Sequence, residues 1–224
     1  MAALSLSSLS LQACGAQPAA RAASTSPTAA APTIPTPPPA AEPFRPAYHY
    51  TPAQGWMNDP NGLIYLNGEY HLFFQYNPDA TVWGPMHWGH ATSADLVNWQ
   101  RLPVALAPDK LGSIFSGSAV VDRGNTAGFG AQALVAVFTH EQGGAQRQSL
   151  AFSTDEGRTW TMYSGNPVLA APGNLKDFRD PKVFWYGDGA AGHWVMVLAA
   201  GNTILFYTSP DLKAWSPAGS FGFG

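Results

Sequence analysis

The feature that most constrains this chain is a repeat of about 58 residues that starts near Tyr48. Three segments share one pattern, in which a β-prone run is followed by Ser-x-Asp and then by a Trp: 91–99, 151–160 and 207–215. Their serines are separated by 60 and 56 residues. An Asp in such a turn can accept hydrogen bonds from its own backbone N–H groups, and the Trp can pack beneath it. We therefore interpret Asp95, Asp155 and Asp211 as structural rather than catalytic.

Each repeat also contains two candidate strands upstream of its turn. Hydrophobic runs bounded by turn residues predict strands over 62–66 and 70–76, over 118–121 and 134–139, and over 183–186 and 193–199. Asn67-Gly68, between the first two, is a strong signal for a type I′ hairpin turn. With the strands on either side of Ser-x-Asp, each repeat holds about four strands, which is typical of β-propeller blades.

The composition agrees with an all-β protein. Gly (23 residues), Pro (20 residues) and aromatic residues (12%) are plentiful, and charged residues make up only 11% of the chain. A net charge of −3 without clusters of Lys or Arg argues against nucleic acid as a partner, and no segment is apolar enough to span a membrane. Residues 48–224 have room for three such repeats, fewer than a closed propeller needs, so we expect a truncated propeller.

The residues before the repeats divide into two parts. Residues 1–14 resemble a signal or lipoprotein leader, in which a short apolar stretch leads to Leu11-Gln12-Ala13-Cys14 without the usual preceding Lys or Arg. Cys14 is the one cysteine, and it is a candidate lipid anchor or an inert thiol in an unprocessed leader. Residues 15–47 are rich in Pro and Ala and predict a disordered tether. This organisation indicates a secreted or cell-envelope protein.

Two Asp-Pro pairs, two repeats apart, are the candidate catalytic positions. Asp59-Pro60 and Asp180-Pro181 are each expected just before the innermost strand of a blade, so both carboxylates face the same end of the central channel. The equivalent point of the second repeat falls at 115–118. Paired acids in a funnel suggest glycoside hydrolysis. Aromatic and polar side chains nearby suit the faces and hydroxyls of a sugar: Trp56, Asn58, Gln75, Trp83, Trp88, Phe115 and Arg179.

Five motifs in order resemble those of glycoside hydrolase family 32, the invertase, levanase and inulinase family. They occupy residues 56–62, 74–78, 83–90, 115–118 and 178–182, and the resemblance is to the N-terminal part of the family. It covers residues 48–224, which we assign to a partial catalytic domain. The family implies a five-bladed β-propeller followed by a C-terminal β-sandwich. On that basis this chain contains about three blades and lacks the sandwich.

The resemblance also implies an activity and a set of site residues. The activity is retaining hydrolysis of terminal β-D-fructofuranosyl residues of fructans, such as levan and inulin, or of sucrose, without a cofactor. Asp59 is then the nucleophile that forms a fructosyl ester, and Asp180 stabilises the transition state. The substrate-binding residues implied by the motifs are Trp56, Met57, Asn58, Gln75, Trp83, Phe115, Ser116 and Arg179.

One family signature has no counterpart in the chain. This signature is a Glu-Cys pair that carries the general acid/base. The glutamates of this sequence lie in the tether, in a hairpin turn, beyond a strand and in a Ser-x-Asp turn: Glu42, Glu69, Glu141 and Glu156. We expect the missing Glu beyond Gly224. The chain alone should fold poorly and be inactive, since loss of a general acid lowers a rate by about 10²- to 10⁴-fold.

Alternative classes of protein fit parts of the sequence. Residues 153–160 match the Asp-box of sialidase propellers, although only one of the three turns matches fully and only Arg179 lies at an innermost strand. A non-catalytic carbohydrate-binding propeller would keep the aromatic pocket and would not need Asp59. His87 and His90 are spaced i, i+3 but lack the Cys or carboxylate partners of a metal site, so no metal is expected.

Overall fold

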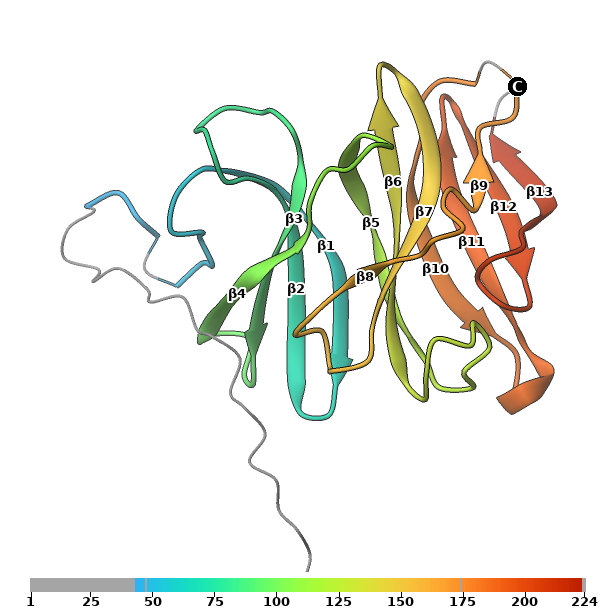
Figure 1. Cartoon of the computed structure of the whole chain (residues 1–224), viewed down its shortest axis with the longest axis horizontal. Coiled ribbons are helices and arrows are strands. Elements are labelled where there is room, and N and C mark those ends of the chain that lie inside the picture. The colour runs from blue at the N-terminus through green and yellow to red at the C-terminus, as the bar shows by residue number, and fades with distance from the viewer. Residues whose placement is uncertain (1–42, 47, 174, 223–224) are drawn as a thin grey trace, which may run out of the picture. The chain divides into compact units, whose positions relative to one another are not determined.

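The computed structural model describes residues 43–46, 48–173 and 175–222 (Figure 1). The expected leader (1–14) lies outside the described residues, as does the expected tether (15–47) apart from residues 43–46. None of the helices in the described ranges is long and apolar enough to cross a membrane.

The strands form three antiparallel sheets, one for each sequence repeat (Figure 1). The first sheet has the order β1 (Trp56–Leu66), β2 (Glu69–Asn77), β3 (His87–Ser93) and β4 (Trp99–Leu106). The second has the order β5 (Ser113–Asp122), β6 (Ala133–Gln142), β7 (Ala145–Ser153) and β8 (Thr161–Met162), and β9 (Leu169–Ala170) also pairs with β7. The third has the order β10 (Phe178–Tyr186), β11 (His193–Ala200), β12 (Thr203–Ser209) and β13 (Ser216–Gly222), with the 3₁₀ turn η2 (Gly189–Ala191) before β11.

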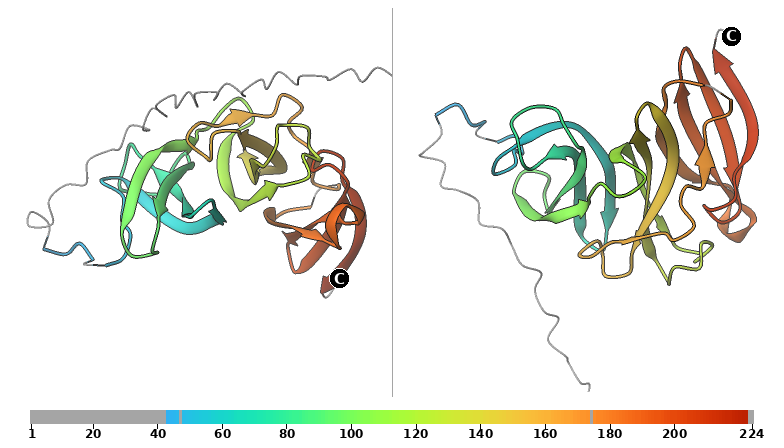
Figure 2. Two further views of the ribbon diagram at one scale, coloured as in Figure 1. Left: turned by 90° about the horizontal axis from the view of Figure 1, so that it is seen from below. Right: turned by 45° about the horizontal axis from the view of Figure 1, so that its top comes forward.

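The three sheets pack face to face in sequence order (Figure 2), and their first strands contact one another in the order β1, β5, β10. Sheets that pack face to face around their first strands are the arrangement of propeller blades. The predicted all-β class and the three blade repeats are therefore confirmed, as an open part of a propeller.

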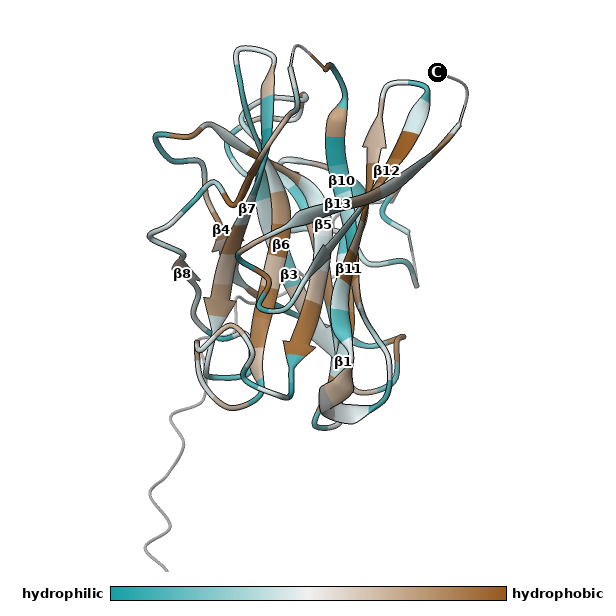
Figure 3. Ribbon diagram, turned by 90° about the vertical axis from the view of Figure 1, so that its right-hand side faces the viewer, coloured by the Kyte–Doolittle hydropathy of each residue, from teal (hydrophilic) through white to brown (hydrophobic). Residues whose placement is uncertain are grey.

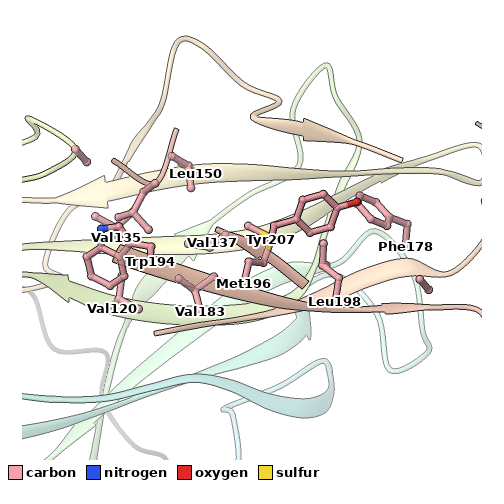
Figure 4. Packing of buried hydrophobic residues seen from close by; sticks show 13 residues of the cluster. Val120, Val135, Val137, Leu150, Phe178, Val183, Trp194, Met196, Leu198 and Tyr207 are labelled. Carbon is pink, nitrogen blue, oxygen red and sulfur yellow. The ribbon is translucent and has the colours of Figure 1, made fainter. Parts of the chain in front are cut away.

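Hydrophobic cores fill the two spaces between neighbouring sheets. Between the first and second sheets the buried cluster consists of Phe73, Trp88, Leu106, Ile114, Ala119, Ala136, Phe138 and Ala151. Between the second and third sheets lies a larger cluster (Figure 4), to which β10 and β11 contribute Phe178, Val183, Trp194, Met196, Leu198 and Ala200. Because the middle sheet is covered on both faces, β6 is buried from Ala133 to His140, and much of β5 and β6 is hydrophobic (Figure 3).

The predicted turns form as expected. Asn67 and Gly68 have φ values of 48° and 94°, and positive φ at both central residues is the requirement of a type I′ turn. In the second Ser-x-Asp turn the N–H of Thr159 donates to Asp155 Oδ1 at 2.9 Å, and Trp160 Nε1 donates to the carbonyl of Gly157 at 3.0 Å. The Asp residues of the first and third turns accept backbone N–H bonds in the same way.

One local expectation is wrong. Asp59-Pro60 and Asp180-Pro181 lie inside β1 and β10 rather than before them. Both pairs sit where the register shifts, which marks a β-bulge. Proline is tolerated there because a bulge leaves a residue out of the ladder, and because each innermost strand pairs on one side only.

Candidate active site

The three innermost strands each carry a bulge at the same end. The register shifts fall between Met57 and Pro60 on β1, between Phe115 and Gly117 on β5, and between Arg179 and Lys182 on β10. A bulge redirects a side chain away from the regular alternation of a strand. The bulged positions hold Asp59, Ser116 and Asp180, in the repeat-equivalent places expected from the sequence.

These bulges surround one cavity of about 130 Å³. Both candidate carboxylates and six of the predicted substrate-binding residues line it: Asn58, Asp59, Gln75, Trp83, Phe115, Ser116, Arg179 and Asp180. Trp56 and Met57 do not line it. Trp56 Nε1 instead donates to Asn58 Oδ1 at 2.8 Å and so orients that amide, while Met57 lies opposite Tyr76 in the ladder of the first sheet.

Asp59 is held by its own strand and by the neighbouring sheet. Ser116 Oγ, on β5, donates to Asp59 Oδ2 at 3.1 Å. Asn61, which is buried, donates from Nδ2 to the backbone carbonyl of Asp59 at 3.3 Å. Ser116 is the only hydrogen-bond donor to this carboxylate within the described ranges, so its second oxygen is available to a ligand in the cavity.

Asp180 faces the same cavity in an unusual backbone conformation. Its φ is +59°, in the left-handed region that non-glycine residues adopt infrequently, although Asn and Asp do so more often than others. Arg179 Nε lies 3.7 Å from Asp180 Oδ2, and Arg179 also pairs with Asp177. Partial burial raises the pKa of Asp180, the Arg179 guanidinium opposes this, and the Asp59 carboxylate adds to it. The electrostatic influence of Asp59 on Asp180 is what two acids sharing one site produce.

The walls of the cavity are aromatic and amide groups. The rings of Trp83 and Phe115 meet edge to face with their centroids 6.0 Å apart, and Trp83 is 57% exposed. Gln75 Nε2 donates to the Ile114 carbonyl at 3.0 Å, which fixes the orientation of that amide. Trp88, expected among the aromatic walls, is instead buried behind Phe115 and donates from Nε1 to its carbonyl at 3.0 Å.

The glutamates of the described residues, and the two histidines considered as metal ligands, have their partners outside the cavity. Glu69 pairs with Arg158, Glu156 accepts from Asn67, and Glu141 accepts from the N–H of Gly144. His90 is buried against His71, with His90 Nε2 3.1 Å from His71 Nδ1, and His87 Nδ1 lies 3.0 Å from the Pro85 carbonyl. In the part of the chain that the structure covers, no group of three His, Cys, Asp or Glu residues could hold a metal ion.

Sequence reasoning missed the polar residues that support the site from the middle sheet. Thr139 and Gln148 are fully buried, and both contact the backbone of β10 beside Asp180. A signal was present in the sequence, because Thr139 ends an otherwise hydrophobic run that starts at Ala133. An unpaired polar side chain at such a position is unfavourable, so a partner was to be expected.

Comparison with known proteins gives consistent matches. The family model described as "Glycosyl hydrolases family 32 N-terminal domain" matches residues 49–224. A levanase of Bacillus subtilis (strain 168) is 61% identical over 184 residues, which cover 81% of this chain and 27% of the levanase. Invertase 2 of Saccharomyces cerevisiae is 48% identical over 189 residues, which cover 79% of this chain and 35% of the invertase.

Solved structures agree with the sequence matches. An exo-inulinase from Aspergillus awamori superposes with a TM-score of 0.75 at 43% identity, covering 82% of this chain and 41% of that chain. A β-fructofuranosidase from Schwanniomyces occidentalis, complexed with fructosyl-erythritol, gives a TM-score of 0.74 at 45% identity and covers 80% and 37%. The chain thus spans between about a quarter and two fifths of the length of these relatives.

Proposed function

This chain belongs to glycosyl hydrolase family 32, and we propose that it supplies the nucleophile of a retaining glycosidase that releases terminal β-D-fructofuranosyl residues from fructans or sucrose. One observation carries the proposal: two aspartates on bulges of non-adjacent blades line a single cavity with aromatic and amide walls. The substrate class follows the printed names of the relatives, which include levanase, invertase and exo-inulinase.

Asp59 acts as the nucleophile in this mechanism. One carboxylate oxygen of Asp59 attacks the anomeric carbon of the fructosyl unit as the bond to the leaving oxygen breaks, which gives a fructosyl ester of Asp59. The hydrogen bond from Ser116 to Asp59 Oδ2 leaves the other oxygen free for attack. Water then cleaves the ester, and the two displacements together retain the anomeric configuration.

Asp180 stabilises positive charge on the sugar ring during both displacements. Its side chain is half exposed and borders the cavity, where it can accept hydrogen bonds from fructose hydroxyls. An ionised carboxylate near an oxocarbenium-like centre lowers the energy of the transition state more than that of the bound substrate. Asn58, Gln75 and Arg179 provide further polar contacts for the sugar hydroxyls.

The leaving oxygen also needs a proton from a general acid. Glu69, Glu141 and Glu156 are engaged outside the cavity. We therefore assign no acid/base to the described residues, and we propose that the 224-residue chain alone turns over about 10²- to 10⁴-fold more slowly than a chain that includes one. A hybrid tests this, in which the chain is joined to the part of the B. subtilis levanase that follows the aligned residues. Equal rates for the chain and this levanase hybrid would contradict the assignment.

The role of Asp59 is tested by Asp59→Asn in the levanase hybrid. Hydrolysis of sucrose and levan should fall by more than about 10⁴-fold, because removing a nucleophile abolishes the covalent route, while sucrose binding measured by calorimetry persists. Asp155→Asn is the matched control, since it alters a carboxylate of a Ser-x-Asp turn and should leave kcat unchanged. Unchanged turnover of Asp59→Asn would exclude Asp59 as the nucleophile. A folded parent hybrid that binds sucrose without hydrolysing it would favour a non-catalytic carbohydrate-binding propeller.

The stereochemistry and specificity need separate measurements. Proton NMR of the first-formed fructose should show the β-anomer before mutarotation, as a double displacement requires. Hydrolysis of sialyl substrates is expected to be undetectable, because the cavity presents a single arginine, Arg179. Release of sialic acid would support the sialidase alternative.

We also propose a secreted or cell-envelope location. A leader at residues 1–14 and a tether at 15–47 suit an enzyme that meets polymeric substrates outside the cell, and one relative is named an extracellular exo-inulinase. Mass spectrometry of the mature N-terminus distinguishes the two states of Cys14. A diacylglyceryl adduct would establish lipidation, and an unmodified Cys14 behind an intact leader would exclude it.

A further inference from the structure

The backbone around Asp180 needs support from outside its own strand. The ladder between β10 and β11 is interrupted between Arg179 and Lys182. Asp180 itself has a φ of +59°, which L-amino acids other than Asn and Asp rarely adopt. Asp adopts this conformation more often than most residues do, but it remains a minority conformation, so hydrogen bonds from neighbouring strands stabilise it.

Three buried polar side chains of the middle sheet supply that support. Gln148 Nε2 donates to the carbonyl of Phe178 at 2.8 Å, and the N–H of Asp180 donates to Thr139 Oγ1 at 3.2 Å. Ser118 Oγ donates to the carbonyl of Pro181 at 2.9 Å and accepts the N–H of Val183, also at 2.9 Å. Four backbone groups, two within the bulge and one on each side of it, are thus paired from the neighbouring blade. We call Ser118, Thr139 and Gln148 the clamp residues.

The hydrogen bonds within the clamp fix the direction of each group. The hydroxyl of Thr139 donates to Gln148 Oε1 at 2.7 Å, so its lone pair is available to the N–H of Asp180. Since Gln148 Oε1 accepts this bond, its Nε2 must face the Phe178 carbonyl. Both side chains are fully buried, and each of their hydrogen bonds can run in one direction only. Such a buried network is rigid.

The clamp has a counterpart one blade earlier. Thr139 and Gln148 face each other across the β6–β7 ladder, and Gln75 and Trp88 face each other across the β2–β3 ladder. Each pair bonds the backbone of the next innermost strand where its bulge begins. The bonds of the earlier pair are those from Gln75 to the Ile114 carbonyl and from Trp88 to the Phe115 carbonyl. The same arrangement therefore occurs in two blades, and in each it holds the bulge of the next blade's innermost strand in place.

We propose that the clamp residues are positioning residues for the reaction, which hold the peptide of Asp180 so that its carboxylate faces Asp59 across the cavity. The proposal rests on the proposed function, in which Asp180 stabilises the transition state. Thr139 and Gln148 do not line the cavity, so they act through Asp180 and not on the sugar. A displaced carboxylate lowers kcat more than it raises KM, because its interaction is strongest in the transition state.

The central test is Thr139→Val in the levanase hybrid, which keeps the shape of the side chain and removes the acceptor for the Asp180 N–H. We expect kcat to fall by about 10- to 100-fold, the range for misplacement of a group by around 1 Å, with KM changed by less than about threefold. Thr139→Ser retains the hydroxyl and should keep kcat within about threefold of the parent. Should Thr139→Val fail to fold, Ser118→Ala removes a single oxygen and carries the same expectation.

Two comparisons separate positioning from general stability. Ser209→Ala removes a hydroxyl that is buried like that of Thr139 but lies at the end of β12 that is far from the cavity. It should therefore lower the thermal midpoint and leave kcat unchanged. In an Asp180→Ala background, Thr139→Val should lower kcat by less than about twofold more, since residues that act as one unit are not additive. An undiminished loss in that background, or a kcat for Thr139→Val within about twofold of the parent, overturns the proposal.

A structural readout keeps the proposal separate from the proposed function. If the folded parent hybrid hydrolyses neither sucrose nor levan, the proposed function fails, and the crystal structure of Thr139→Val then decides the role of the clamp. Release of Asp180 from positive φ, with a displaced carboxylate, supports positioning. An Asp180 peptide superposable on the parent overturns it.

Discussion

The aspartates at one end of the blades stabilise turns, whereas those at the other end line the cavity. In the Ser-x-Asp turns the carboxylates are saturated with donors: Asp95 accepts from the N–H groups of Val97 and Asn98, from the Asn98 side chain and from Ser93. At the other end, among the residues that the structure describes, the Asp59 carboxylate accepts one hydrogen bond, from Ser116, and Asp180 Oδ2 lies 3.7 Å from Arg179 Nε. A carboxylate whose oxygens all accept hydrogen bonds from the protein stabilises the fold. A carboxylate with an oxygen that is not so engaged can interact with a ligand.

The pKa shifts follow the same division. Donation by the backbone and side chain of Asn98 and by the Val97 N–H lowers the pKa of Asp95. Burial acts to raise the pKa of Asp211, but the N–H groups of Ala214 and Lys213 outweigh it and the pKa is lowered. At Asp180 burial prevails over Arg179, and the pKa is raised. The fold therefore lowers the pKa of the turn carboxylates and raises that of Asp180, and a perturbed pKa is common among functional carboxylates.

After Asp59→Asn, the largest expected effect on this contrast comes from Asp180→Asn. The change removes the negative charge and keeps the size of the side chain, so kcat of the levanase hybrid should fall by about 10²- to 10³-fold, as when one preorganised electrostatic group is removed. Steady-state kinetics with sucrose measures the loss, and circular dichroism checks that the fold is unchanged. A variant with full kcat would remove Asp180 from the chemistry.

Next in size is Asp211→Ala, the complementary change at a turn. Three hydrogen bonds to the carboxylate disappear, those from Ser209, Lys213 and Ala214, so the free energy of unfolding should fall by about 1–2 kcal/mol, as for loss of a capping side chain. Urea denaturation measures the decrease, and kcat should stay within about twofold of the parent. A large loss of kcat without a loss of stability would mean that the turns and the site are coupled.

A smaller effect is expected for Ser116→Ala. Loss of the one hydrogen bond to Asp59 Oδ2 should lower kcat/KM by about 3- to 10-fold, in line with the net worth of a single exposed hydrogen bond. Ser116→Thr keeps the hydroxyl and serves as the control. A loss that matches Asp59→Asn would give Ser116 a direct part in the reaction.

The smallest effect is a difference in the pH dependence of stability. Because the pKa of Asp211 is lowered on folding, its stabilisation is present above the usual value of 3.8 and is lost as the pH falls through the folded pKa. The raised pKa of Asp180 gives the opposite slope, so stability decreases as the pH rises from 3.8 through the folded pKa. Asp211→Asn should flatten the decline at acid pH, and Asp180→Asn should raise stability near neutral pH. Urea denaturation across this pH range distinguishes the two slopes, and equal slopes would contradict the assigned shifts.

Much of the fold could be predicted because its signals are local. The Asn67-Gly68 turn and the Ser-x-Asp turns depend on residues within a few positions of one another, and their period sets the number of blades. The convergence of Asp59 and Asp180 on one cavity followed from the same period. The bulges within β1 and β10 were missed because the backbone restriction imposed by proline is the same before a strand and in a bulge.

The support of the site could not be predicted in the same way. The bond from Gln148 to the Phe178 carbonyl joins residues of two blades, and no local pattern identifies which backbone group a buried amide meets. The same limit applies to Trp88, which an aromatic count places in the cavity and the packing of the first two sheets places behind it. The residue type indicates that a buried polar side chain requires a hydrogen-bond partner. The three-dimensional arrangement of the blades decides which group that partner is.

The bonds that assemble the site have a consequence for the order of folding. Ser116 and Asp59 are 57 residues apart in the chain, and Ser118 and Val183 are 65 residues apart. Contacts of such long sequence separation close large loops and form late in folding. We therefore expect the cavity to be among the last features to form, after the second sheet has docked against both of its neighbours. In refolding of the levanase hybrid, the appearance of turnover would report the docking of the blades, well after the hairpins that build each of them have formed.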